Sequence, residues 1–159
     1  MKSDQPRGSL SAIASALGLA SLVFIAAGGA GPDSATAGQS LLAPCPGKPN
    51  CVCSDDPDQG HRVPPYRLAA PPEDAWRSLG KVIAEFPRTE VVSVTETDLH
   101  AQVKSRLFGF VDDVVFQLRP TQNVIAVRSA SRTGYSDLGV NRRRIEEIRQ
   151  KLKELKVVE

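Results

Sequence analysis

The chain has 159 residues and carries 20 Lys and Arg against 18 Asp and Glu, so its formal net charge is only +2. This near-neutral balance argues against nucleic acid as a partner, because proteins that bind it through charge are strongly basic. Apolar residues form 41% and charged residues 24% of the chain, enough for a packed core and too much for wholesale disorder. With 3 cysteines and 5% aromatic residues, a disulfide-built miniprotein and a broad stacking surface are also excluded.

The first 37 residues have the layout of a secretory signal peptide. Lys2 and Arg7 precede an uncharged apolar stretch, Leu10–Ala27, and Ala35 and Ala37 are the small residues that a signal-peptidase site requires. An uncleaved anchor is the alternative, since a helix over this stretch would be about 27 Å long, just short of a bilayer core. We therefore expect residues 1–37 to be a signal peptide or N-terminal anchor. The protein is then periplasmic or otherwise extracytoplasmic, and meets a membrane only through an uncleaved segment.

Residues 38–70 are rich in proline, which interrupts helices and central strands. Eight of the 12 prolines lie between Gly38 and Pro72. We expect this segment, called the arm below, to be extended over the domain and to end in a short strand near Arg62–Leu68.

Residues 71–159 alternate between helical and strand-like patterns. A helix is predicted to begin at Pro72 and to end before Pro87, because apolar residues recur between them at a spacing of 3.6. The strand-like segments that follow are Val91–Thr95, Leu99–Val103, Phe110–Leu118 and Asn123–Ser131. The last helix has one stripe, made of Leu138, Asn141, Ile145, Ile148, Leu152 and Leu155. Short turns predict an antiparallel sheet. The expected class is α+β, with four to five strands, two helices on one face, and the order β-α-β-β-β-β-α.

The three cysteines lie close together in the arm. We expect a disulfide between Cys45 and Cys51 in an oxidising compartment, because a bridge from Cys51 to Cys53 would be strained, and a Cys45–Cys53 bridge would contradict this pairing. Cys53 is then left over. The alternative is a zinc site with His61 as the fourth ligand, but the C-x-C spacing suits a tetrahedral site poorly. We expect the disulfide and no metal.

Three segments together resemble a known family. They are Pro49–Cys51, Phe108–Val114 and the run Arg128–Arg144. With them the chain, from Pro44 to about Leu152, resembles the bacterial and plastid family called domain of unknown function 1499. The resemblance implies an extracytoplasmic or lumenal address, and it implies no catalytic residue and no cofactor. The family usually has a small residue where Cys53 stands.

Two neighbouring aspartates face opposite sides of one predicted strand. Asp112 shares a face with Val114 and Phe116, so we expect it to be buried against an arginine. Asp113 lies on the other face. Asp137 or Ser136 is expected to cap the last helix. The predicted structural network, which would fix a strand-to-helix corner, consists of Asp112, Asp113, Ser129, Ser131 and Asp137.

Arginines near the start of the last helix suit an anion. The candidate ligand-binding residues are Arg128, Arg132, Tyr135, Asn141, Arg142 and Arg143. We therefore expect a non-catalytic binding or assembly module, whose partner is an envelope protein or a small anionic ligand. The alternative is a hydrolase-like envelope enzyme that uses Asp112 with Arg132 and Tyr135. His100 and His61 are expected at the surface.

Overall fold

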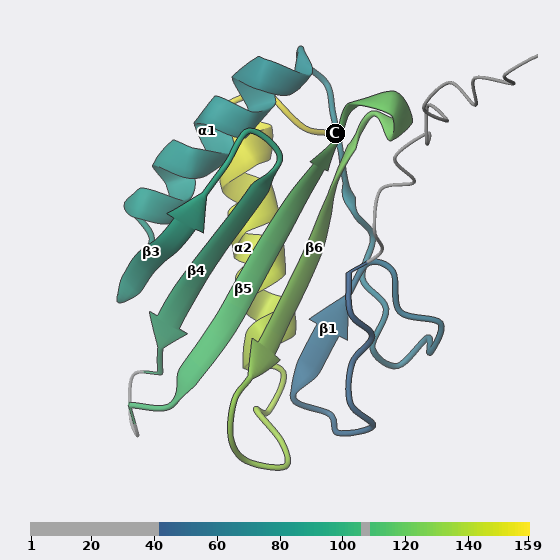
Figure 1. Cartoon of the computed structure of the whole chain (residues 1–159), viewed down its shortest axis with the longest axis vertical. Coiled ribbons are helices and arrows are strands. Elements are labelled where there is room, and N and C mark those ends of the chain that lie inside the picture. The colour runs from purple at the N-terminus through teal and green to yellow at the C-terminus, as the bar shows by residue number, and fades with distance from the viewer. Residues whose placement is uncertain (1–41, 106–108) are drawn as a thin grey trace, which may run out of the picture. The chain divides into compact units, whose positions relative to one another are not determined.

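The computed structural model describes residues 42–105 and 109–159 (Figure 1). The expected signal peptide or anchor lies outside these residues. In chain order the elements are β1 (Cys51–Cys53), β2 (Tyr66–Arg67), α1 (Pro72–Ala84), β3 (Thr89–Val94), β4 (Asp98–Lys104), β5 (Val111–Arg119), a short 3-10 helix (Pro120–Gln122), β6 (Val124–Ser131) and α2 (Val140–Glu154). None of the helices in the described ranges is long and apolar enough to cross a membrane.

The strands form one antiparallel sheet in the order β1-β6-β5-β4-β3, and β2 pairs with β6 off this path. Both helices lie on the same face of the sheet (Figure 1). The predicted α+β class and element order are confirmed. The sheet has six strands instead of four to five, because the cysteine segment itself pairs with β6, with Cys51 opposite Ala130 and Cys53 opposite Arg128.

The core lies between the sheet and the two helices. On β5 the alternation of side chains buries Val114, Phe116 and Leu118 on the helix-covered face. The helices bury apolar stripes against them, which include Leu79, Val82 and Ile83 on α1 and Ile145, Ile148 and Leu152 on α2. A fully buried side chain of this kind contributes about 1.5–3 kcal/mol, so these stripes are the main source of stability.

The predicted stripe of the last helix is wrong at both ends. Leu138 lies before the helix and is 84% exposed, and Leu155 follows the helix and is exposed. The helix begins later than expected because Gly139, whose φ is +78°, lies between Leu138 and the first helical residue. Arg144 and Arg149 are instead among the buried residues of α2.

Part of the arm packs on the face of the sheet that the helices leave open, and other parts of it contact α2. Arg128 and Arg119 point to this face, since their neighbours Val127 and Leu118 point into the core. The Arg128 Nε donates to the Ala43 carbonyl at 2.9 Å, and Arg119 forms an ion pair with Asp55 at 2.6 Å. The predicted Cys45–Cys51 disulfide is confirmed. The arm also contains β2, within the segment where a short strand was expected.

Candidate functional site

A buried polar network, which we call the polar corner, joins β5, β6 and the first turns of α2. Its members are Asp112, Ser129, Ser131, Asn141 and Arg144. Arg144 donates from Nη2 to Asp112 Oδ2 at 2.5 Å, and the two side chains are only 5% and 4% exposed. Arg144 Nη1 also donates to Ser129 Oγ and to Asn141 Oδ1, at 3.0 and 2.6 Å. The guanidinium is therefore neutralised and hydrogen-bonded within the core, as a buried charge requires.

Asn50 connects the arm to the polar corner. Its carbonyl accepts hydrogen bonds from the Asn141 Nδ2 and from the Ser131 N–H, each at 3.0 Å. Its own amide Nδ2 donates to the Gly134 carbonyl at 2.9 Å. We did not predict this role, although Asn50 stands in one of the segments that suggested the family. The next residue, Cys51, forms the disulfide with Cys45.

Asp113 lies on the open face of the sheet with two partners. Arg132 donates to both of its oxygens, at 2.7 and 2.8 Å, and the His100 Nε2 lies 2.8 Å from Oδ1. The hydrogen bonds from Arg132, which outweigh partial burial, hold the pKa of Asp113 below its usual range. Asp112 and Asp113 thus belong to separate ion pairs on opposite faces.

The remaining predicted arginines donate to backbone carbonyls. Arg142 bonds the carbonyls of Gly60 and Arg62, and Arg143 bonds that of Leu138. With Arg128 held by Ala43 and Arg132 by Asp113, these side chains do not converge on one anion site.

The residues of the enzyme alternative also lie apart. Asp112 pairs with Arg144 on the core face of β5, whereas Arg132 pairs with Asp113 on the open face. Tyr135 is 71% exposed and lines a different cleft from Asp112. The structure therefore does not bring Asp112, Arg132 and Tyr135 together.

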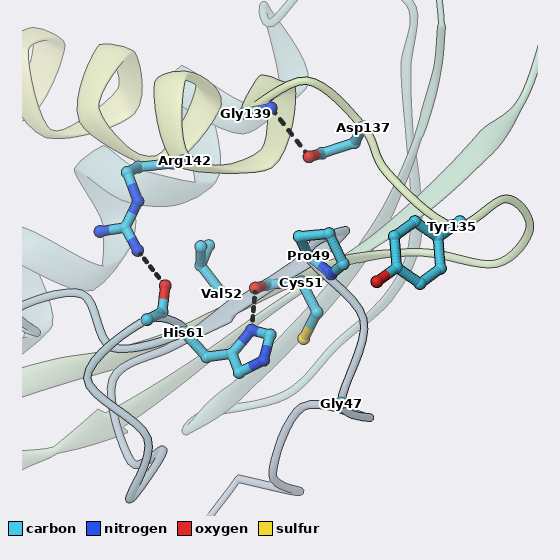
Figure 2. A pocket seen from close by; sticks show the side chains of 10 residues that line it. Gly47, Pro49, Cys51, Val52, His61, Tyr135, Asp137, Gly139 and Arg142 are labelled. Carbon is cyan, nitrogen blue, oxygen red and sulfur yellow. Dashed lines mark hydrogen bonds between the residues drawn. The ribbon is translucent and has the colours of Figure 1, made fainter.

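Tyr135 lines the first of two clefts, which we call the His61 cleft and which has a volume of about 350 Å³ (Figure 2). It lies between the arm and the start of α2. The His61 Nδ1 donates to the Cys51 carbonyl at 3.0 Å, and the Arg142 Nη2 donates to the Gly60 carbonyl at 2.8 Å. The described residues contain no group of three or more His, Cys, Asp or Glu side chains that could hold a metal ion. The side chains of His61 and Arg142 are thus hydrogen-bonded to the backbone of other residues that line this cleft.

The second cleft, which we call the Leu138 cleft, has a volume of about 450 Å³. Thr133, Gly134, Ser136 and Leu138 line it, and Asp137 lines both clefts. The polar corner contributes Asp112, Ser131 and Arg144 to its lining. The apolar lining residues are Phe86, Val103, Phe110, Leu138 and Val140, and the other charged ones are Arg88, Lys104, Arg143 and Glu147. An apolar cleft with a few charged groups is the usual form of a small-molecule site.

A model of one family, a protein of unknown function (DUF1499), matches residues 41–152. The chain belongs to this family. The three segments that suggested DUF1499 meet in space: Asn50, Asp112 and the residues from 129 to 144 form the polar corner and its surroundings. A search of curated proteins finds no match to the chain. The three segments that resemble the DUF1499 family therefore supply residues to the polar corner and to the lining of both clefts.

Proposed function

We propose that this protein is an exported, non-catalytic binding module that holds an anionic ligand, or a partner segment carrying an anionic group, in the Leu138 cleft. The observation that carries the proposal is the conformation of Leu138 at the rim of that cleft. Leu138 has a φ of +54° and is 84% exposed. For a residue with a Cβ, the left-handed region costs about 1–2 kcal/mol.

Neighbouring hydrogen bonds hold this conformation. The Leu138 N–H donates to Ser136 Oγ at 3.2 Å, and the next N–H, that of Gly139, donates to Asp137 Oδ1 at 2.9 Å. Because the Leu138 side chain is exposed, packing in the core does not account for this conformation. Such strain is characteristic of ligand-contacting positions, and it supports a contact made through Leu138.

The charges at the cleft favour an anionic partner. Outside the Asp112–Arg144 pair, the charged lining residues are Arg88, Lys104 and Arg143, which are positive, and Asp137 and Glu147, which are negative. The oxygens of Asp137 already accept the N–H groups of Gly139 and Asn141. The cleft also borders the N-terminal end of α2, where the helix dipole is positive. The acid at its base, Asp112, is already matched by Arg144.

A binding function also agrees with how the polar groups are used. The donors and acceptors of the polar corner bond to one another and to Asn50. The residues that a hydrolase would need lie in separate places, and no observation favours the enzyme alternative.

Native mass spectrometry of protein purified without denaturation from an envelope fraction tests the proposal. We expect a bound acidic molecule or peptide on the wild type, lost in Leu138→Asp and kept in Leu155→Asp. Leu155 is the matched control, because it is also an exposed leucine at an end of α2 but does not line the cleft. A bound mass that persists in Leu138→Asp, or a wild type with none, contradicts the proposal.

Export has its own test. A phosphatase reporter fused after Gly60 is expected to be active, since this enzyme works outside the cytoplasm, and a cytoplasmic reporter at the same point is expected to be silent. The reverse pattern would rule out export.

A further inference from the structure

We infer that the ligand of the Leu138 cleft is an anionic amphiphile, with an extended apolar body and a carboxylate or phosphate at one end. This inference rests on the proposed function and adds the chemical class of the ligand. A small hydrophilic anion would leave the apolar walls in water, and a neutral apolar molecule would leave the cationic groups unused.

The apolar half of the site comes from four parts of the chain. Phe86 follows α1, Val103 lies on β4, Phe110 precedes β5, and Leu138 and Val140 flank Gly139 at the start of α2. Phe110, Leu138 and Val140 are 49%, 84% and 37% exposed. Three of the eight exposed large apolar side chains in the described ranges thus line one cleft. Gathered apolar surface of this kind marks a binding site, whereas scattered exposed residues need no explanation.

The polar half consists of three cations from separate elements. Arg88 lies just before β3, Lys104 ends β4, and Arg143 is in the first turns of α2. The Arg88 Nε donates to the Lys104 carbonyl at 3.2 Å, which holds two of these residues side by side. Arg143 Nη1 donates to the Leu138 carbonyl at 2.9 Å, which fixes a cation beside the apolar rim. Within the described ranges, none of the three takes part in an ion pair with an acidic side chain.

The size of the cleft agrees with such a ligand. A volume of about 450 Å³ lies within the range of roughly 300–1,000 Å³ that is usual for small-molecule sites. Arg143 and Leu138 are in direct contact, so the head group and the start of the apolar body would bind at one point of the rim. Arg88 and Lys104 also line the cleft and add two more positive charges to it.

Calorimetric titration with hexanoate, octanoate and decanoate, each below its micelle concentration, tests both halves of the inference. Burial of one methylene contributes about 0.8 kcal/mol, so affinity is expected to rise about fourfold for each added methylene. Decyltrimethylammonium, which has the same chain and the opposite charge, is expected to bind at least about tenfold more weakly than decanoate.

Two exposed positions give matched pairs of variants. Leu138→Asp and Arg143→Gln are expected to weaken decanoate binding, whereas Leu155→Asp and Arg67→Gln are not, because Leu155 and Arg67 lie outside the cleft. Far-ultraviolet circular dichroism and a thermal melt of each variant check that it is folded.

The outcomes separate this inference from the proposed function. If hexanoate binds as tightly as decanoate and Arg143→Gln abolishes both, the amphiphile is wrong while the anion site remains. Equal binding of decanoate and decyltrimethylammonium would also overturn the inference. If none of these probes binds, although native mass spectrometry finds a ligand that Leu138→Asp removes, the ligand belongs to another chemical class and the inference fails alone.

Discussion

The ion pair between Asp112 and Arg144 gives the sharpest test of how the fold is held together. Both side chains are at least nine-tenths buried, and Asp112 Oδ2 lies 2.5 Å from the guanidinium. Replacing Asp112 with alanine leaves a buried cation with only Ser129 and Asn141 as neutral acceptors. Removing one partner of such a pair costs about 3–5 kcal/mol, because the other charge stays buried.

Asp113→Ala is the control at the neighbouring position. Asp113 Oδ2 also lies close to its partner, 2.7 Å from the Arg132 Nε. The two side chains are 25% and 46% exposed, however, so water can solvate either charge once the partner is gone. The expected cost is about 1 kcal/mol or less, as for exposed pairs. Near the size of this domain, 1 kcal/mol moves the melting temperature by about 3–5 °C. We therefore expect a loss of roughly 10–20 °C for Asp112→Ala and of no more than about 5 °C for Asp113→Ala.

Urea denaturation and thermal melting at pH 7 measure the difference. The double variant Asp112→Leu with Arg144→Met separates charge from packing. It removes both charges, so it is expected to recover much of the stability lost in Asp112→Ala, since apolar replacements of buried ion pairs are often neutral. Equal small losses in the two single variants would refute the reasoning, and so would a double variant much less stable than Asp112→Ala.

Three further predictions concern the arm and the start of α2. Hydrogen bonds from Arg119 and Leu42 to Asp55, and from Cys45 and Asp58 to Asp56, outweigh burial and lower both carboxyl pKa values. Their contribution is complete above the unfolded pKa of about 3.9 and disappears as the pH falls through the lower folded values, so the melting temperature is expected to drop below about pH 4; an unchanged value down to pH 2 would contradict this. Cys53 is fully buried and burial raises its thiol pKa, so iodoacetamide is expected to label it only in urea; rapid native labelling would contradict it. Asp137→Ala is expected to cost about 0.5–2 kcal/mol, measured by urea denaturation, and to speed amide exchange at Asn141.

The elements of the domain could be predicted because their signals are local. Pro72 and Pro87 bracket α1, and the alternation of apolar and polar residues marks β4. β1 could not be predicted, because its three residues between turns have no period. It pairs with β6, which lies more than 70 residues further along the chain. The strand β3 was predicted from its β-branched residues. Its position at the edge of the sheet, where most of its side chains are exposed, could not be predicted from that composition.

The candidate site was predictable only in part. Asp112 could be placed on the core face from the alternation of β5, and its burial required a cation. The apolar stripe of the last helix could not identify Arg144 as that cation. In a sequence, an arginine on the buried face of a helix cannot be distinguished from one that faces solvent. The contributions of Arg88 and Lys104 to the Leu138 cleft arise from tertiary packing, and no local pattern marks them.

The hydrogen bonds around residues 132–139 explain why the polar corner matters to the cleft. Asn50 fixes Gly134, Ser136 fixes Leu138, and Asp137 accepts the N–H groups of Gly139 and Asn141. The exposed Leu138 is therefore positioned before any ligand arrives, and binding need not order it. This is the reason for the exchange measurement on Asp137→Ala. If the amide of Asn141 stays as protected as in the wild type, Asp137 does not hold the start of α2, and the cleft must owe its shape to the buried contacts of Arg144 instead.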